Sequence, residues 1–252
     1  MKGLLQAGTG TVVALALVAC GGGGSSGNGS LGGGSPPPGG GSVQYNLQAG
    51  IANMVSKGLS VNVSMSGTVN ATSTTPAASF TGTGTYTLSA AGASTSFNGA
   101  GAYGQIESIN GTVTVSGQSQ TVSTQVTNYY ATGDSAFVGE VEKSEYDVAQ
   151  ASITWPTSLT GGAGGTLGTV LRYSDNTQST SIGTAQLSYA TTAPSTSGGA
   201  IGITLTTKIY DKNNSLIETD TRQYTMTSAN VITFVSQQAN NVASGTITVT
   251  AQ

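Results

Sequence analysis

Carboxylates are the side chains of this sequence whose type and spacing could support chemistry. Half of the ten acidic residues fall in one segment, Asp134, Glu140, Glu142, Glu145 and Asp147. A facing pair could act as acid and base in glycoside hydrolysis, or oxygen ligands could bind a hard cation such as calcium. No D-x-D-x-D-G calcium loop is present, and Lys143 partly neutralises the segment. We therefore expect a solvated loop or strand edge, with no catalytic and no metal-binding residue.

The residue types that the chain lacks exclude several other mechanisms. There is no histidine and only one cysteine, which excludes Ser-His-Asp triads, Cys-His dyads and histidine-ligated zinc. The segment Gly99–Gly104 matches G-x-G-x-x-G, but a dinucleotide fingerprint must open a helix, and this segment lies in a strand-like pattern. We expect a protein that is not an enzyme and has no cofactor.

Charge is sparse along the whole chain. Charged residues make up 7% of the sequence, against about 25% in an average soluble protein. Glycine, serine and threonine take their place, so the surface is expected to be neutral and polar. Because no basic stripe is present, nucleic acid is excluded as a partner.

Apolar and polar residues alternate at every second position through most of the chain after Gly58. This period is typical of strands with one buried and one solvated face. The expected strands are 59–69, 79–88, 94–103, 109–116, 121–130, 166–173, 182–190, 200–211, 215–226, 230–236 and 245–251. Turn dipeptides such as Asn110-Gly111, Ser116-Gly117 and Asp175-Asn176 separate many of them. The pattern predicts an antiparallel all-β fold.

The strands are expected to form one domain. About ten or eleven of them would build a curved sheet, an open barrel or a sandwich over residues 43–252, with a possible sub-boundary near 150–165, where the alternation is interrupted. One short helix precedes them, because Leu47, Ile51, Met54 and Val55 share a helical face and Lys57-Gly58 supplies a helix end. We expect this helix to pack on the sheet.

Residues 200–226 predict a hairpin with its tip at Lys212–Asn214 and Asn214 in the left-handed conformation. The predicted register places Lys208 opposite Glu218, Ile209 opposite Ile217, and Tyr210 opposite Leu216. Ile209 and Ile217 would then face the core, and the ladder Glu218, Asp220 and Arg222 would face solvent.

Aromatic residues give two further expectations. Tyr129 and Tyr130 are neighbours on a predicted strand, so they point to opposite faces. Trp155 is expected to be a core anchor rather than a ligand platform.

The N-terminus carries a targeting signal. Thr11–Ala19 is an apolar run of the length of a signal-peptide core and too short to span a bilayer. The run ends in Leu17-Val18-Ala19-Cys20, which resembles the lipobox of bacterial lipoproteins. The resemblance implies that residues 1–19 are a cleaved signal peptide and that Cys20 is acylated and becomes the new N-terminus. Gly21 after the cysteine implies sorting to the outer membrane of the cell envelope.

Residues 20–42 follow as the lipidated cysteine and a tether rich in glycine, serine and proline. A chain of this composition lets a folded domain stand off the membrane. We expect a lipid-anchored envelope lipoprotein that acts by structure or binding, with an envelope protein or glycan as partner. Two alternatives stay open: a carrier of hydrophobic molecules in a curved sheet, and a carboxylate-based glycan hydrolase.

Overall fold

The computed structural model describes residues 44–73, 76–196 and 198–252, and it confirms an antiparallel all-β fold with one short helix. The elements are α1 Leu47–Lys57, β1 Leu59–Val69, β2 Ala78–Leu88, β3 Ser94–Phe97, β4 Ala100–Val115, β5 Gln118–Ala131, β6 Phe137–Glu142, β7 Glu145–Ile153, β8 Gly164–Tyr173, β9 Ser181–Thr192, β10 Ile201–Asp211, β11 Leu216–Met226, β12 Ile232–Asn241 and β13 Gly245–Ala251. All thirteen strands belong to one sheet. The strand number is slightly higher than expected, because the acidic segment forms β6 and β7.

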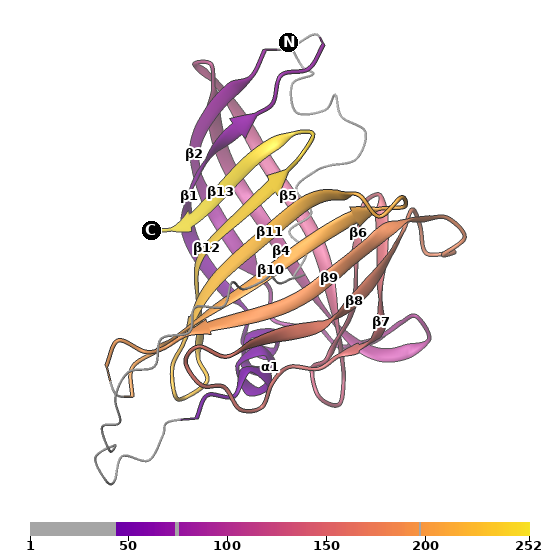
Figure 1. Ribbon diagram of the computed structural model, residues 1–252, viewed down its shortest axis with the longest axis vertical. Helices are drawn as coiled ribbons and strands as arrows, with labels where there is room; N and C mark the ends of the chain where they lie inside the picture. Colours follow the sequence, from indigo (N-terminus) through magenta and orange to yellow (C-terminus); the bar gives the residue numbers. More distant parts are fainter. Residues whose placement is uncertain (1–43, 74–75, 197) are drawn as a thin grey trace, which may run out of the picture.

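The sheet closes on itself. Its order runs β2-β1-β13-β12-β11-β10-β9-β8-β7-β6-β5-β4-β3, and β2 also pairs with β4. This second pairing closes a barrel of twelve strands (Figure 1). The short strand β3 is added beside β4. The interruption near 150–165 is a connection between β7 and β8, which pair directly.

Two glycines lie at the seam where the barrel closes. Gly84 of β2 pairs with Gly111 of β4. A Cβ added at Gly111 would lie 2.3 Å from the Thr83 carbonyl oxygen, and one at Gly84 would lie 2.5 Å from that of Asn110. The two backbones therefore approach more closely than side chains would allow, which permits strong local curvature. The turn expected at Asn110-Gly111 is wrong, because β4 runs straight through it.

The helix closes one end of the barrel (Figure 1). Its N-cap Asn46 accepts a hydrogen bond from the Ala49 backbone N–H at 2.9 Å, and Gly58 ends it with φ 69°. Its apolar face, Leu47, Ile51, Met54 and Val55, is buried as expected. No helix in the described part of the chain has the length and apolar character needed to cross a membrane.

Aromatic side chains fill the barrel near the helix. Tyr130 is fully buried and contacts Phe137 edge to face, with ring centroids 5.9 Å apart. Trp155 is 3% exposed, and its indole N–H donates to the Ser135 carbonyl at 3.0 Å, which confirms it as a core anchor. Tyr129 points to the outer face and stacks on Phe97 of β3 at 4.4 Å. The two adjacent tyrosines therefore lie on opposite faces, as predicted.

The hairpin of β10 and β11 is present, but most of its predicted register is wrong. Asn214 is left-handed with φ 62°, and Tyr210 pairs with Leu216, as predicted. A β-bulge between Ile209 and Tyr210 then shifts the pairing, so that Ile209 faces Glu218 and Lys208 faces Thr219. The connecting loop is Lys212–Ser215, one residue longer than expected. The extra residue on one strand reverses which side chains of β11 share a face with Ile209.

Candidate functional site: a polar belt inside the barrel

The acidic segment expected to be a solvated loop is a hairpin, β6–β7, whose carboxylates face the barrel interior. Glu140 pairs with Asp147 and Glu142 with Glu145, around a turn at Lys143 and Ser144. Glu140 is 4% and Asp147 3% exposed, whereas Glu142 and Glu145 are half-buried near the barrel mouth. The expectation of a solvated segment is therefore wrong for four of its five acidic residues. Only Asp134 lies exposed, in the turn before β6.

Inward-facing polar side chains form a row across five neighbouring strands. The members, in strand order from β4 to β8, are Gln105, Asn128, Glu140, Asp147 and Arg172, and each is the register partner of the next. All five are at most 6% exposed. We call this row the polar belt. Gln105 links it to the helix, since its side-chain amide donates to the Met54 carbonyl at 3.0 Å.

Arg172 neutralises part of the belt near the barrel mouth. Its Nε donates to Asp147 Oδ2 at 3.3 Å, and its Nη2 forms an ion pair with Glu145. On the other side of the interior, Glu218 accepts a hydrogen bond from the Asn241 amide at 2.8 Å. Carboxylates outnumber cations here.

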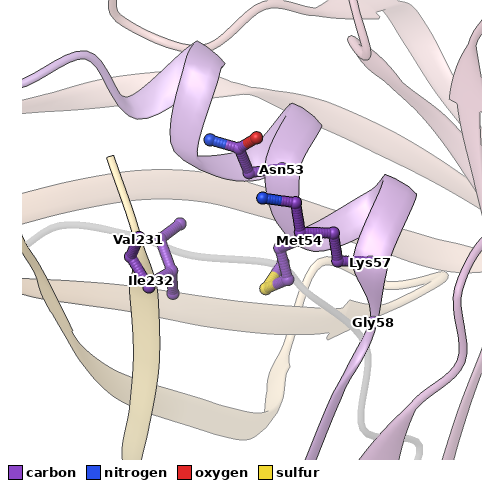
Figure 2. Close-up of a pocket in the computed structure, with 6 residues that line it drawn as sticks. All are labelled: Asn53, Met54, Lys57, Gly58, Val231 and Ile232. Carbon is purple, nitrogen blue, oxygen red and sulfur yellow. The ribbon is translucent and has the colours of Figure 1, made fainter. Parts of the chain in front are cut away.

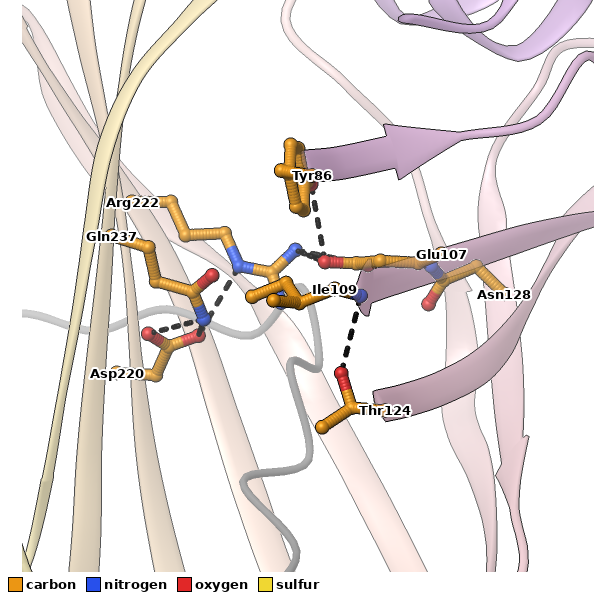
Figure 3. A network of polar contacts seen from close by, with 8 residues as sticks. All are labelled: Tyr86, Glu107, Ile109, Thr124, Asn128, Asp220, Arg222 and Gln237. Carbon is orange, nitrogen blue, oxygen red and sulfur yellow. Dashed lines mark hydrogen bonds and ion pairs between the residues drawn. The ribbon is translucent and has the colours of Figure 1, made fainter. Parts of the chain in front are cut away.

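A second cluster surrounds Arg222 deeper in the barrel (Figure 3). Arg222 lies 3.0 Å from Glu107 through Nη1 and 3.2 Å from Asp220 through Nε, and the three side chains are at most 2% exposed. The Gln237 amide donates to both Asp220 oxygens at 3.0 Å. The Tyr86 hydroxyl and the Asn128 amide donate to Glu107 at 3.1 and 2.9 Å, which joins this cluster to the belt.

Burial raises the pKa of five interior carboxyl groups, Glu140, Glu142, Asp147, Glu218 and Asp220. It raises the pKa of Asp147 and of Asp220 to about 7, against the partial opposing effect of Arg172 and of Arg222. Burial followed by repulsion from Glu145 raises the pKa of Glu142 to about 7. The pKa of Glu140 is also raised well above its ordinary value, first by burial and then by Asp147. These groups resist ionisation unless a positive charge accompanies them.

Several buried polar atoms of the interior have no hydrogen-bond partner in the structure. They include Asn128 Oδ1, Glu140 Oε2, Asp147 Oδ1, Glu218 Oε1, Thr207 Oγ1 and the Tyr130 hydroxyl. Natural proteins contain few such atoms, and each calls for a water, an ion or a ligand. Four of the six lie on the belt or directly beside it.

Glu218, Asp220 and Arg222 were expected to face solvent, and this expectation is wrong, because all three are at most 3% exposed. The sequence did carry a signal of their true orientation. In the alternation along β11 they lie on the same face as the apolar residues Tyr224 and Met226. On the opposite face, threonine occupies three of the five positions from 217 to 225. Glu107 and Arg172 were not predicted as site residues at all. Cys20, the predicted lipidation site, lies outside the described residues.

A small pocket lies at the other end of the barrel, between α1 and the start of β12 (Figure 2). It has a volume of about 70 Å³ and is lined by Asn53, Met54, Lys57, Gly58, Val231 and Ile232. Sites for drug-sized ligands have about 300–1,000 Å³. This pocket is too small to hold a lipid.

Among the described residues, no three side chains of histidine, cysteine, aspartate or glutamate gather as a metal cluster. Comparisons with known proteins add no assignment to the site. No family model, no curated protein and no solved structure matches this chain.

Proposed function

We propose that this protein is a lipid-anchored lipoprotein of the bacterial cell envelope that acts by structure or binding, without catalysis. One observation carries the proposal: the barrel keeps most of its carboxylates inside, and threonines occupy many outward positions of its strands. Seven of the ten acidic residues belong to the interior clusters, namely Glu107, Glu140, Glu142, Glu145, Asp147, Glu218 and Asp220, together with both arginines.

The outward positions of the strands support attachment through a lipid. On β10 and β11, threonines 204, 206, 219, 221 and 225 alternate with the buried residues, and on β13 threonines 246, 248 and 250 lie on the outer face. A barrel inserted in a bilayer has an outward apolar band instead. We propose that acyl chains on Cys20 provide the membrane attachment, since two or more chains anchor stably.

Burial of the carboxylates supports a non-catalytic role. Glu107, Glu140 and Asp220 are at most 4% exposed, so a polymeric substrate cannot reach them without opening the barrel. The neutral hydroxyl-rich exterior favours a partner recognised by hydrogen bonds and shape, such as a glycan or a neutral surface of an envelope protein.

The anchor is tested by Cys20→Ala. The variant should lose fatty-acid labelling and leave the membrane pellet for the soluble or uncleaved-precursor fraction, with the barrel still folded. A matched control is Ser25→Ala in the tether, which should stay in the pellet. A cleaved Cys20→Ala protein that remains membrane-bound, or a parent protein that takes up no fatty acid, would refute the proposal.

The glycan-hydrolase alternative has one supporting observation. Glu142 and Glu145 are half-buried register partners at the mouth, and directly opposed residues of antiparallel strands have Cβ atoms about 5 Å apart. Cell-wall glycan release by the parent that Glu142→Gln abolishes would establish this alternative. The hydrophobic-carrier alternative receives less support, because the middle of the barrel interior is lined by charged and amide side chains.

A further inference from the structure

The centre of the polar belt contains three acceptor oxygens with no donor. They are Asn128 Oδ1, Glu140 Oε2 and Asp147 Oδ1. Their residues are consecutive register partners on β5, β6 and β7, and the exposed fractions are 0%, 4% and 3%. Buried acceptors of neighbouring residues repel one another unless a proton donor or a cation lies between them.

The orientation of the Asn128 amide is fixed by its neighbour. Its Nδ2 donates to Glu107 Oε2 at 2.9 Å, and a flipped amide would place an oxygen against that carboxylate. Asn128 Oδ1 is therefore an acceptor without a partner. The Tyr130 hydroxyl, two residues along β5 from Asn128, is buried and also has no hydrogen-bond partner. An amide oxygen and a phenol thus accompany the two carboxylates, which distinguishes this place from a cluster of acidic groups alone.

The arginines of the interior are already engaged elsewhere. Arg222 pairs with Glu107 and Asp220, and Arg172 pairs with Glu145 and with the other oxygen of Asp147. No ion pair in the described part of the chain reaches Glu140. An ionised Glu140 would therefore need its ion-pair partner from outside the chain.

We propose that Asn128, Glu140 and Asp147 bind a calcium ion inside the barrel. Two carboxylates and an amide oxygen are the ligand types that calcium prefers, and the Tyr130 hydroxyl and waters can complete its six to eight ligands. Magnesium needs a smaller, near-ideal octahedron and retains its waters, so this row suits it less.

A cation would approach the site past the turn of the β6–β7 hairpin. Glu142 and Glu145 lie two residues nearer to the turn of the β6–β7 hairpin and are half-buried, so they would attract a cation toward the belt. The inference goes beyond the proposed function, because it rests on the barrel interior and not on the lipid anchor. An experiment that refutes the calcium site does not affect the proposed lipid anchor, and the reverse also holds.

The test is a thermal melt of the purified protein at pH 7.5 in EDTA, in calcium and in magnesium at equal ionic strength. Calcium should raise the Tm by several degrees in a saturable way, and magnesium should require at least tenfold higher concentration. Glu140→Gln should weaken calcium binding at least tenfold, whereas Asp175→Asn, at an exposed turn outside the barrel, should leave it unchanged. A parent Tm independent of calcium would overturn the proposal, as would an equal response to magnesium.

Terbium luminescence locates the ion even if Glu140→Gln does not fold. Terbium replaces calcium in oxygen sites and is excited through nearby tyrosines, so the parent should show emission that calcium abolishes. Tyr130→Phe should lower that emission relative to Tyr210→Phe, whose tyrosine lies on the outer side of β10. Equal emission from the two variants would place the ion elsewhere and overturn the assignment.

Discussion

The two halves of the barrel interior follow the same alternation of inward and outward residues but are stabilised in opposite ways. Near the helix, apolar and aromatic side chains such as Ile51, Phe137 and Trp155 pack without needing partners for charge. Around Arg222 and along the belt, carboxylates are buried and depend on specific ion pairs and hydrogen bonds. Apolar packing tolerates changes of pH, whereas a buried ionic network does not. The comparison predicts different responses to substitution at the two ends.

A large loss that does not depend on pH is expected at the apolar end. Phe137→Ala should lower the free energy of unfolding by about 3–5 kcal/mol, because it removes a fully buried ring that packs on Tyr130. The loss should be the same at pH 5 and pH 8, as measured by urea unfolding. The control is Ile106→Ala. Ile106 is 43% exposed on the outer face of β4, so its loss should change stability by under about 0.5 kcal/mol.

At the ionic end, Arg222→Met should cost about 3–5 kcal/mol at pH 8, because it leaves Glu107 and Asp220 buried without a cation. The loss should be smaller at pH 5, where Asp220, whose pKa burial raises to about 7, is protonated. Urea unfolding of parent and variant at both pH values measures this difference. A loss independent of pH would show that Arg222 acts by packing alone.

The matched control replaces the whole cluster. The triple variant Glu107→Gln, Asp220→Asn and Arg222→Met should recover most of the stability that Arg222→Met loses, since neutral side chains of similar size bury no uncompensated charge. No recovery would mean that the hydrogen bonds of Tyr86 and Gln237 to this cluster carry its stability instead.

Asp220 and Asp211, in the β10–β11 hairpin, are expected to have smaller effects on stability. Their contributions to the free energy of unfolding change with pH in opposite directions. Burial raises the pKa of Asp220 to about 7, so the native state holds its proton more tightly than the unfolded chain. Its contribution to stability is present at low pH and is lost as pH rises from about 4 to about 7. Asp220→Asn should therefore flatten the fall in unfolding free energy between pH 5 and pH 8.

Asp211, at the tip of the same hairpin, supplies the contrast. Hydrogen bonds from the Ser215 and Asn213 backbone N–H groups lower the pKa of this exposed carboxyl. Its contribution is present above about pH 4 and is lost as pH falls. Asp211→Asn should lower the free energy of unfolding at pH 7 but not at pH 3. If the unfolding free energies of the Asp220→Asn and Asp211→Asn variants depended on pH with equal slopes, the expected difference between a buried and an exposed aspartate would be contradicted.

The smallest effect is expected in the loop outside both halves. Asn214 is left-handed with φ 62°. Asn214→Ala should cost about 1 kcal/mol, and Asn214→Gly should change stability by only a few tenths. The midpoints of chemical denaturation of the two variants measure the difference. An equal loss of stability in both would mean that contacts of the asparagine side chain matter, rather than its backbone conformation.

Much of the fold could be predicted from residue order alone. The helix, its glycine end, the left-handed Asn214 and most strands follow from spacing and turn chemistry, which act over a few residues. The β6–β7 hairpin was missed because its charges were taken to face solvent, although Val141, Tyr146 and Val148 alternate with the carboxylates as in a strand. Here the charged half of the alternation faces the interior. The bulge at Ile209 was missed because nothing local requires the extra residue.

The sequence by itself determined an antiparallel all-β fold, a buried helix face and a chain without histidine. Its N-terminal signal and Cys20 predict an anchor, and that prediction awaits experiment. Only the tertiary structure decided that the sheet closes through β2 and β4, and that Glu107, Glu140, Asp147, Asp220 and Arg222 meet inside it. The physical reason is that alternation divides a strand into two faces but does not say which face is inside. When one face is charged, that choice depends on partners that lie far away in the chain, such as Glu107 for Arg222.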